Sequence, residues 1–240
     1  GQGLSLVVQV GGRTLIYDTG FGEPEGFTQA EKVLLPFLTH QGIERIDTLV
    51  ISHADRDHSG GLELLRVGVP IGRHLGFGGE PCRNGERWLW GSVEFLVING
   101  PGHGQQDRND GSCGLLIKTP GLSVLIPGDV SAARERQWVR YWRDELAVSI
   151  LVLAHHGSRT SSSHALLKWA SPEWALVSAG RGNAFGHPHE EVVERVKTSE
   201  QSTVLSTAMS GAIEINLAER NIPELTPARG PRAPYWLKLP

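Results

Sequence analysis

The sequence predicts an α+β domain in which two mixed β-sheets pack face to face, with helices on their outer sides. Two observations lead to this prediction. Segments rich in strand-forming residues are followed by a helical segment and then by further strands and helices, and this order occurs twice along the chain. The chain also has 240 residues, of which 39% are hydrophobic, which is enough for one sizeable core or two small ones.

Composition and charge exclude several classes of protein. The net charge is −3, with acidic and basic residues mixed along the chain, so a globally basic nucleic-acid-binding protein is not indicated. No segment approaches the roughly 18 uninterrupted apolar residues of a membrane helix, and no signal peptide opens the chain. The two cysteines, Cys82 and Cys113, are too few for a cysteine-rich zinc module. A single bridge between them and two unpaired thiols both remain open.

The first half of the chain is predicted to be rich in strands. Leu4–Val10 and Thr14–Tyr17 are apolar, β-branched segments on either side of Gly11-Gly12, which predicts a hairpin. Asp47–Ser52 is a short apolar strand that runs directly into His53, and Lys32–His40 has helical spacing. The other elements expected here are a helix that Ser59 caps, carrying Leu62, Leu64 and Leu65, and strands at Val69–Ile71, Arg87–Trp90 and Val93–Ile98.

The second half alternates strands with helices. Ser112–Thr119 and Leu122–Ile126 form a predicted hairpin that ends just before Asp129. Ala132–Glu145 is an amphipathic helix whose arginines and tryptophans either guide a nucleic-acid strand or form a solvated face over the core: Arg134, Arg136, Trp138, Arg140, Trp142 and Arg143. The remaining elements are strands at Ile150–Leu153 and Trp174–Ser178, helices at Leu166–Ala170 and Glu190–Lys197, and a final strand pair of Val204–Ser206 with Ala212–Leu217. Residues 1–218 are expected to form the domain, and the Pro-rich residues 219–240 a tail that extends along the surface or is disordered.

The sharpest chemical signal is the segment His53–His58, which places four metal-binding side chains within six residues after a buried strand. In an extended segment side chains alternate, so His53, Asp55 and Asp57 would project to one side. A tight turn at Asp57-His58 would then bring His58 to the same cavity. Imidazole and carboxylate ligands suit zinc, manganese or iron. A polar loop with a helix cap is the alternative, but groups packed so closely repel one another unless a cation neutralises them.

Later segments offer further site residues. Asp129 follows a Pro-Gly turn at a strand end, where its carboxylate could bridge two metal ions. His155 and His156 follow another strand, and because adjacent side chains point to opposite faces, one is expected to ligate and the other to meet substrate. His187 either stabilises a leaving group or acts as a general acid, or it is a loop histidine that caps the next helix.

Taken in order, His-x-Asp-x-Asp-His, Gly-Asp and His-His-Gly-Ser resemble the metallo-β-lactamase superfamily, and in more detail the C-terminal domain of the ComEC/Rec2 competence proteins, which take up DNA in transformable bacteria. The matching segments cover nearly the whole chain: GQGLSLVV, TLIYDTG, VLLPFLTHQGI, IDTLVISHADRDHSGGLELL, WLWGSVEFLVI, NDGSCGLLI, LIPGDV, LVLAHHGSRTSS and NAFGHPH. The resemblance implies the four-layer αβ/βα sandwich of that superfamily. The family's opening motif is Asp-Val-Gly-Gln-Gly and this chain begins at Gly-Gln-Gly, so we expect a domain cut from a longer protein.

The resemblance also implies a role for each site residue. Two divalent metal ions, Mn²⁺ or Zn²⁺, would be held by His53 and Asp55 at one site, by Asp57, His58 and His155 at the other, and by Asp129 as the bridge. Asp18 would be a supporting carboxylate that orients the His53–His58 loop. The catalytic residues would be Asp57, His156 and His187, and the substrate-binding residues Asn109, Ser112, Ser158 and Arg159.

Two departures from the family pattern affect the first metal site. Asp55 stands where the superfamily more often has a histidine, which the ComEC group tolerates. The histidine that usually precedes Gly-Asp is matched by Asn109, with His103 as the other candidate. Because a neutral amide binds transition metals weakly, we expect this site to be loosely occupied or to prefer a harder ion such as Mn²⁺.

These residues predict a metal-dependent hydrolase suited to phosphodiesters, with a metal-bridged hydroxide attacking phosphate. The resemblance to the competence proteins implies a nuclease domain that degrades DNA during natural transformation. The donor-rich rim favours phosphate oxygens. The alternatives are another hydrolase of this fold, such as a phosphorylcholine-type esterase or a lactonase, and a non-catalytic DNA-guiding module. Expected partners are DNA, either single-stranded or the strand not transported, and the membrane-embedded channel domain of the same parent protein, with no small-molecule organic cofactor. The expected location is that of a soluble, extracytoplasmic or periplasmic domain of an inner-membrane protein.

Overall fold

The computed structural model describes residues 2–100, 109–200, 202–216 and 224–229, and the chain divides into two compact units. Unit 1 consists of Gly1–Leu115 and Pro127–Val130, and unit 2 of Leu116–Ile126 and Ser131–Pro240. Within the described ranges, every helix is too short or too polar to cross a membrane.

Unit 1 carries the first strands and helices. In chain order these are β1 (Leu6–Val10), β2 (Arg13–Tyr17), a π-helical turn (Ala30–Leu34), α1 (Leu35–His40), β3 (Ile46–Ile51), α2 (Arg56–Ser59), α3 (Leu62–Gly68), β4 (Ile71–Gly76), β5 (Arg87–Trp90) and β6 (Val93–Asn99). The boundary between the units falls within β7 (Gly114–Lys118).

Unit 2 carries the remaining elements. These are β8 (Ser123–Ile126), α4 (Ala132–Trp142), a 3₁₀ turn (Arg143–Leu146), β9 (Ile150–Val152), a second 3₁₀ turn (Ala154–Gly157), α5 (His164–Ala170), β10 (Trp174–Val177), α6 (Glu190–Glu200), β11 (Thr203–Ser206), α7 (Thr207–Ser210), β12 (Ile213–Asn216) and β13 (Glu224–Pro227).

Two mixed sheets are present, which together with the helices confirms the predicted α+β class. One has four strands in the order β1-β2-β3-β4, with β1 antiparallel to β2 and the later pairs parallel. The other has seven strands in the order β11-β10-β9-β8-β7-β6-β5. Its β5–β6 pair is antiparallel, whereas β8, β9, β10 and β11 are parallel neighbours.

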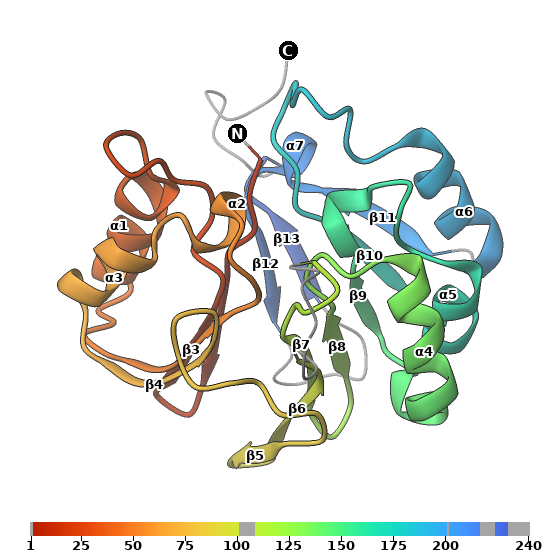
Figure 1. The fold of residues 1–240 in the computed structure, drawn as a ribbon, viewed down its shortest axis with the longest axis horizontal. Helices are drawn as coiled ribbons and strands as arrows, with labels where there is room; N and C mark the ends of the chain where they lie inside the picture. The colour runs from red at the N-terminus through yellow and green to blue at the C-terminus, as the bar shows by residue number, and fades with distance from the viewer. Residues whose placement is uncertain (1, 101–108, 201, 217–223, 230–240) are drawn as a thin grey trace. The chain divides into compact units, whose positions relative to one another are not determined.

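The core of unit 1 lies between its four-stranded sheet and the helices α1 and α3, which lie over one face of that sheet (Figure 1). Ile16, Leu49 and Ile51 of the strands belong to one buried cluster with Leu38 of α1 and Leu65 of α3. Each such side chain stabilises the fold by roughly 1.5–3 kcal/mol when it is fully buried. This packing fixes the carboxyl ends of β2 and β3, where the predicted site residues begin.

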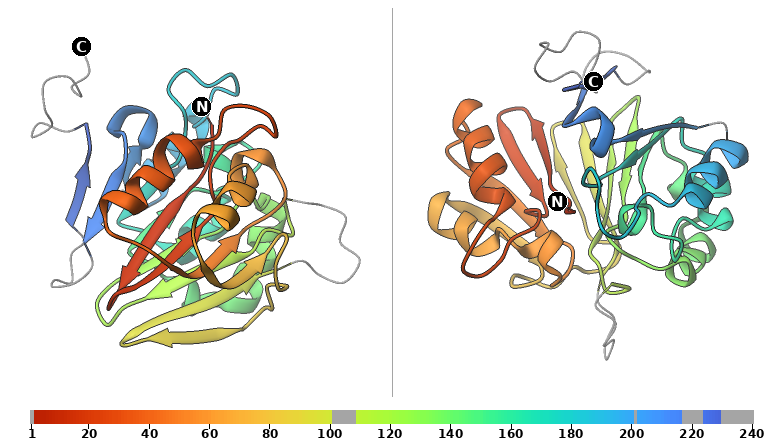
Figure 2. Two further views of the ribbon diagram at one scale, coloured as in Figure 1. Left: turned by 90° about the vertical axis from the view of Figure 1, so that its left-hand side faces the viewer. Right: turned by 90° about the horizontal axis from the view of Figure 1, so that it is seen from above.

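In unit 2, the parallel strands are covered by α4, α5 and α6, which Figure 2 shows side by side along the sheet. α5 contacts both of the other helices, and the buried residues include Trp138 of α4, Leu166 of α5 and Val196 of α6. β9 and β10 are paired in register from Ile150 with Trp174 onward. The segments that follow these two strands therefore begin at the same edge of the sheet.

Several predicted boundaries are wrong. Ser59 does not cap the helix of Leu62–Gly68; it ends α2, and Gly61 holds the cap position without a side-chain hydrogen bond. The strand expected at Val69–Ile71 lies at Ile71–Gly76, where pairing with β3 is available. The helix from Ala132 stops at Trp142 because Arg143 adopts φ +40°, outside the helical region.

The final strand pair is also wrong. Val204–Ser206 lies in β11, which pairs in parallel with β10, and β12 instead pairs in antiparallel with β13. Glu224–Pro227 therefore forms a strand in the region that was expected to be an extended or disordered tail. Its proline occupies the last position of the strand, where a missing N–H costs little. The proposed domain boundary after residue 218 stays a prediction.

Candidate metal centre

The centre begins where two neighbouring strands of unit 1 end. β2 and β3 are parallel, with Tyr17 opposite Val50, so Asp18 and Ser52 follow adjacent strand ends. The Asp18 N–H donates to the Val50 carbonyl at 2.8 Å, and Asp18 has a left-handed backbone with φ +58°. Aspartate tolerates this conformation better than most residues. The turn aims the Asp18 carboxylate at the segment that follows β3.

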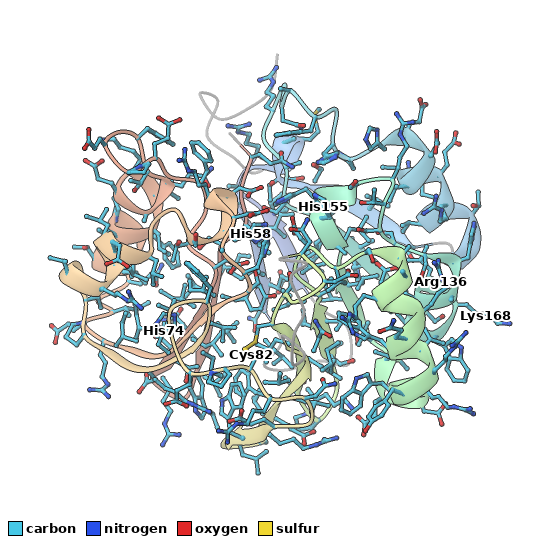
Figure 3. All side chains as sticks on the ribbon, viewed as in Figure 1. His58, His74, Cys82, Arg136, His155 and Lys168 are labelled. Atoms are coloured by element: carbon cyan, nitrogen blue, oxygen red, sulfur yellow. A yellow bond between two sulfur atoms is a disulfide. The ribbon has the colours of Figure 1, made fainter. Side chains whose placement is uncertain are left out.

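Asp18 orients the imidazole of His58. Its carboxylate is fully buried and accepts three hydrogen bonds of 2.7 Å, from the Ser52 N–H, the Ser52 hydroxyl and Nδ1 of His58. Because a carboxylate can only accept, Nδ1 of His58 carries a hydrogen, and in the neutral imidazole the lone pair therefore lies on Nε2. Outer carboxylates of this kind fix the tautomer of metal-binding histidines. His58 is labelled in Figure 3.

Nε2 of His58 lies beside two carboxylates. It is 3.2 Å from Oδ1 of Asp129 and 4.0 Å from Oδ2 of Asp57. The ligand atoms of these three residues all lie within 4.8 Å of one another. Asp129 is almost fully buried, and its own N–H donates to the Ser112 hydroxyl at 3.1 Å. One imidazole and two carboxylates are a donor set that suits Zn²⁺ or Mn²⁺.

The electrostatics of this group favour a positive charge at its centre. Burial alone lowers the pKa of His58, but the carboxylates of Asp129 and Asp18 outweigh it and raise the pKa well above its usual value. A proton on Nε2 thus serves as the counter-charge to the buried carboxylates. A divalent cation would replace that proton and neutralise more of the negative charge.

His53 offers a second, independent sign of a metal site. The Ser52 hydroxyl donates to Asp18, so at 3.0 Å it accepts from Nδ1 of His53, which leaves the lone pair on Nε2. That Nε2 is buried and has no hydrogen-bond partner among the residues that the structure describes. Burial and the neighbouring His58 lower the pKa of His53, which favours the neutral, ligating form. A cation would satisfy this atom, whose burial without a partner is otherwise costly, so the residues present fit a metal ion.

The other predicted residues of unit 1 have different surroundings. Oδ2 of Asp55 lies 3.7 Å from Nε2 of His53, consistent with a shared ligand role. Asp57 lies in the helical turn α2, so it does not alternate with His53 and Asp55 along an extended segment as predicted. Ser112 is fully buried, and its hydroxyl accepts from the Asp129 N–H, so it supports Asp129. Its substrate-binding role stays a prediction. The Asn109 carbonyl accepts from the Ser112 N–H in a tight turn, and His103 lies outside the described residues.

In unit 2, a sharp turn carries the two adjacent histidines. His155 and His156 both have left-handed backbones, with φ +50° and +55°, which costs of order 1–3 kcal/mol each. Nδ1 of His156 donates to the Ser178 carbonyl at 2.8 Å, so its lone pair is on Nε2, and its side chain is buried. His155 is more exposed, with Nδ1 3.4 Å from the Thr160 hydroxyl. The sequence left open which histidine ligates, and the tautomer and burial favour His156.

Three further predicted residues lie near or beyond this turn. The ring of His187 lies 6.0 Å from that of His155 and 6.5 Å from that of His156, between centroids. The Ser158 hydroxyl bonds to that of Thr160 at 3.0 Å. Arg159 points to solvent, where its guanidinium is 3.9 Å from the Glu191 carboxylate. Unit 2 thus groups His187 with the histidine pair, whereas Arg159 is a surface residue.

The predicted nucleic-acid-guiding helix has a mixed character. Arg136, Arg140 and Arg143 are exposed, and Arg136 is labelled on α4 in Figure 3. Trp138 is buried in the core of unit 2. Trp138 therefore agrees with the second interpretation, in which the helix has a solvated charged face and packs its tryptophan into the core. Among the described residues, no interaction links the exposed arginines to a ligand.

Cys82 and Cys113 form a disulfide, which decides between the two alternatives that the sequence left open (Figure 3). Cys113 lies directly after Ser112. Its N–H donates to the Ser52 carbonyl at 2.9 Å, and its carbonyl accepts from the Tyr17 hydroxyl at 2.8 Å. The bridge therefore anchors the segment just before β7 that presents Ser112 to Asp129.

Comparisons with known proteins agree with the resemblance found in the sequence. A family model described as the metallo-beta-lactamase superfamily matches residues 1–181. The chain is 34% identical to competence protein ComA of Neisseria gonorrhoeae, over 92% of this chain and 32% of that protein. It is 31% identical to recombination protein 2 of Haemophilus influenzae, over 100% of this chain and 30% of that protein. The chain thus spans about a third of the length of these relatives.

Solved structures show the same fold. Igni18, a metallo hydrolase from the archaeon Ignicoccus hospitalis, superposes with a TM-score of 0.57 at 19% identity, over 85% of this chain and 92% of that one. At this level of identity the likeness concerns the fold alone.

Proposed function

Because the chain belongs to the metallo-beta-lactamase superfamily, a superfamily of metal-dependent hydrolases, we propose that it is a phosphodiesterase that degrades DNA during DNA uptake. One observation carries the hydrolase part of this proposal: Asp18 holds His58 with its Nε2 3.2 Å from the buried Asp129 carboxylate. The similarity to competence proteins supports DNA as the substrate class.

Two divalent ions, Mn²⁺ or Zn²⁺, are proposed for the site. The proposed ligands are His53, Asp55, Asp57, His58, Asp129 and one histidine of the His155-His156 pair. We favour His156 in place of His155, because Ser178 holds it in the tautomer of a ligand. When bound, the ions would neutralise phosphate charge and lower the pKa of water to near neutrality.

The chain's own residues then have separate tasks. Asp18 keeps the His58 tautomer fixed through its 2.7 Å hydrogen bond. His187 would deliver a proton to the leaving oxygen of the phosphodiester, and whichever histidine of the pair does not ligate would contact the phosphate. Asn109 and Ser158 would donate hydrogen bonds to phosphate oxygens, and Arg159 would attract the DNA backbone from the surface.

The whole protein is proposed to place this domain outside the cytoplasm. The Cys82–Cys113 disulfide supports such a location, because disulfides persist in oxidising compartments. The chain covers about a third of its relatives' length, which leaves room for a membrane-embedded channel domain in the same parent protein. DNA and that channel domain are the proposed partners.

The proposal is tested by metal analysis and DNA digestion with matched variants. Protein stripped by a chelator is reloaded with Mn²⁺, Zn²⁺ or Mg²⁺ and incubated with single-stranded DNA, a phosphorylcholine ester and a lactone. We expect DNA cleavage with Mn²⁺ or Zn²⁺, lost by at least about 100-fold in Asp57→Ala and kept in Asp144→Ala, whose side chain is exposed on unit 2.

Each other result points to a defined alternative. Turnover of the ester or the lactone without DNA cleavage would establish a hydrolase of another class. Tight DNA binding with no bound metal and no turnover of any substrate would identify a DNA-guiding module.

A further inference from the structure

We propose that Phe185 is a stacking platform for a base of the DNA substrate, so that the preferred substrate is a strand with unpaired bases. This inference rests on the proposed function and deepens it by naming the form of DNA. It comes from the surroundings of Phe185 within unit 2, on the loop between β10 and α6.

Phe185 presents an aromatic ring to solvent beside the histidines. Its side chain is 64% exposed, although large apolar side chains of this unit are mostly buried. Its ring lies 5.7 Å from the His187 ring, with only 24° between the two planes. One face of the phenyl ring is thus turned towards an imidazole, and the rest is available to a ligand.

The loop that carries Phe185 is held from within by Asn183. Oδ1 of Asn183 accepts from the N–H groups of Phe185 (3.2 Å) and His187 (3.0 Å). Its Nδ2 donates to the carbonyls of Gly180 (2.9 Å) and His187 (2.7 Å). The bonds at Phe185 and His187 fix the backbone on both sides of Gly186, which has φ +66°. The backbone therefore holds the ring outward before any ligand binds. Stacking of a ligand on the ring would cost little conformational entropy, because the loop is already ordered.

The neighbours of the ring suit a nucleotide better than an apolar acyl chain. Imidazoles of His155 and His189 lie 6.0 and 5.1 Å from His187, so the apolar area ends at Phe185 itself. Arg181 is exposed on the same loop and adds a positive charge. A phosphate near the imidazoles and a base on the phenyl ring would use both parts of this surface. Base-on-aromatic stacking is also tolerant of sequence, because every base has a flat face.

Duplex DNA would not use this platform, because its bases are already stacked and paired. The proposal therefore predicts a preference for single strands, and within single strands a dependence on the bases themselves.

The test compares binding of a labelled thymidine oligonucleotide with that of an abasic strand of the same length, measured by fluorescence anisotropy in chelator-treated protein. Wild-type protein is expected to bind the strand with bases between about fivefold and about 100-fold more tightly. Phe185→Ala should lose this preference and bind the abasic strand as wild type does, and Phe185→Trp should restore it. Tyr141→Ala is the matched control, because Tyr141 is an even more exposed aromatic residue of unit 2.

Cleavage by the metal-loaded enzyme gives a second readout. Phe185→Ala should raise KM for the oligonucleotide and leave kcat within about twofold, as expected when an interaction is equally strong in bound substrate and transition state. The inference would be overturned if wild type and Phe185→Ala showed the same preference for the strand with bases over the abasic strand. It would also be overturned if Phe185→Ala weakened the binding of both strands by the same factor. Absence of cleavage in wild type would overturn the proposed function, while the binding comparison would still decide the platform.

Discussion

At the scale of single residues, Asp18 decides which nitrogen of His58 is offered to a cation. A fully buried carboxylate that accepts three hydrogen bonds of 2.7 Å leaves Nδ1 of His58 no other role than donor. It also fixes the Ser52 hydroxyl, which in turn sets the tautomer of His53. One carboxylate therefore orients two candidate ligands.

Replacing Asp18 should weaken metal binding more than it weakens the fold. In Asp18→Asn one carboxylate oxygen becomes an amide NH₂ group, which donates hydrogen bonds and cannot accept them. The one remaining oxygen cannot replace both oxygens as acceptor for Ser52 and His58. We expect a loss of metal affinity of roughly 10- to 100-fold, measured by competition with a coloured chelator. Asp47→Asn is the control, because Asp47 also accepts a backbone N–H, from Thr14 at 2.8 Å, in the same sheet. Equal affinity in the two variants would contradict the orienting role.

Glu135 is a buried carboxyl group that holds the loop after the histidine turn. Its two oxygens accept from the N–H groups of Ser162 (2.7 Å) and Ser163 (2.6 Å), which fixes the start of α5. Burial raises its pKa to about 7, more than these N–H groups and Arg136 lower it. The neutral form of Glu135 is therefore more favoured in the folded chain than in the unfolded chain.

This shift predicts a stability that falls as pH rises. The unfolded chain releases the proton near pH 4.5, the ordinary value, and the folded chain near pH 7. Between these values the folded state holds more protons than the unfolded state. The stabilisation of the folded state by protonated Glu135 is therefore complete below pH 4.5 and is lost as pH rises through 7. Relative to Glu135→Gln, wild type should lose about 3 kcal/mol of unfolding free energy between pH 4.5 and 8, measured by urea denaturation. A difference that does not change with pH would refute the assignment.

At this scale the sequence predicts residues with chemistry of their own and misses those whose role is burial. His53 and His58 are metal-binding types that lie close together after a strand, so their spacing marks them, whereas Asp129 is marked only by its order with the other motifs. Ser52, Tyr17 and Glu135 carry no such mark, because their importance arises from being enclosed by the fold. The preference for His156 over His155 rests on its hydrogen bond to the Ser178 carbonyl and on its burial, which no side-chain pattern indicates.

At the scale of elements, the Cys82–Cys113 bridge ties the segment before β5 to the residue before β7. Both cysteines are buried, so the bond lies inside the unit that holds Asp18 and Asp129. The loop it closes contains the β5–β6 hairpin and ends next to Ser112.

Removing the bridge should destabilise the fold substantially. For cysteines separated by 31 residues, loop closure in the unfolded chain corresponds to roughly 3–4 kcal/mol. Cys82→Ser with Cys113→Ser should lower the unfolding free energy by about that amount in urea. A reductant should lower the stability of wild type similarly and leave the double variant unchanged. If the reductant affects both proteins equally, the loss does not come from this bond.

Elements were predicted correctly where local pattern and tertiary pairing agree. The β1–β2 hairpin has β-branched arms around Gly11-Gly12, and the structure pairs Val10 with Arg13 across that turn. β4 was misplaced because Ile71–Gly76 contains Gly72, Arg73 and His74, and only its pairing with β3 makes it a strand. β13 was missed because prolines nearby outweigh its short alternation of exposed and half-buried residues.

At the scale of the whole molecule, the order of motifs predicted the fold better than any single motif. Short strands could belong to many α+β folds, whereas His-x-Asp-x-Asp-His, Gly-Asp and His-His-Gly-Ser each follow a strand that ends at the carboxyl edge of a sheet. That order agrees with the superfamily match over residues 1–181. The number of metal ions and the substrate do not follow from the order, because one fold supports several chemistries.

Metal binding should be visible as a gain in stability of the whole chain. Without a cation, Asp18, Asp129 and Asp57 hold their negative charge around one imidazole, and a proton on His58 offsets only part of it. A ligand that binds only the folded state at 100 times its Kd adds about 2.7 kcal/mol. For a chain of this length that corresponds to a rise in Tm of roughly 5–10 °C, measured by calorimetry with Mn²⁺ or Zn²⁺ and reversed by a chelator. The rise should vanish in Asp129→Asn and persist in Asp144→Asn; a rise of equal size in both variants would mean that the ion binds elsewhere.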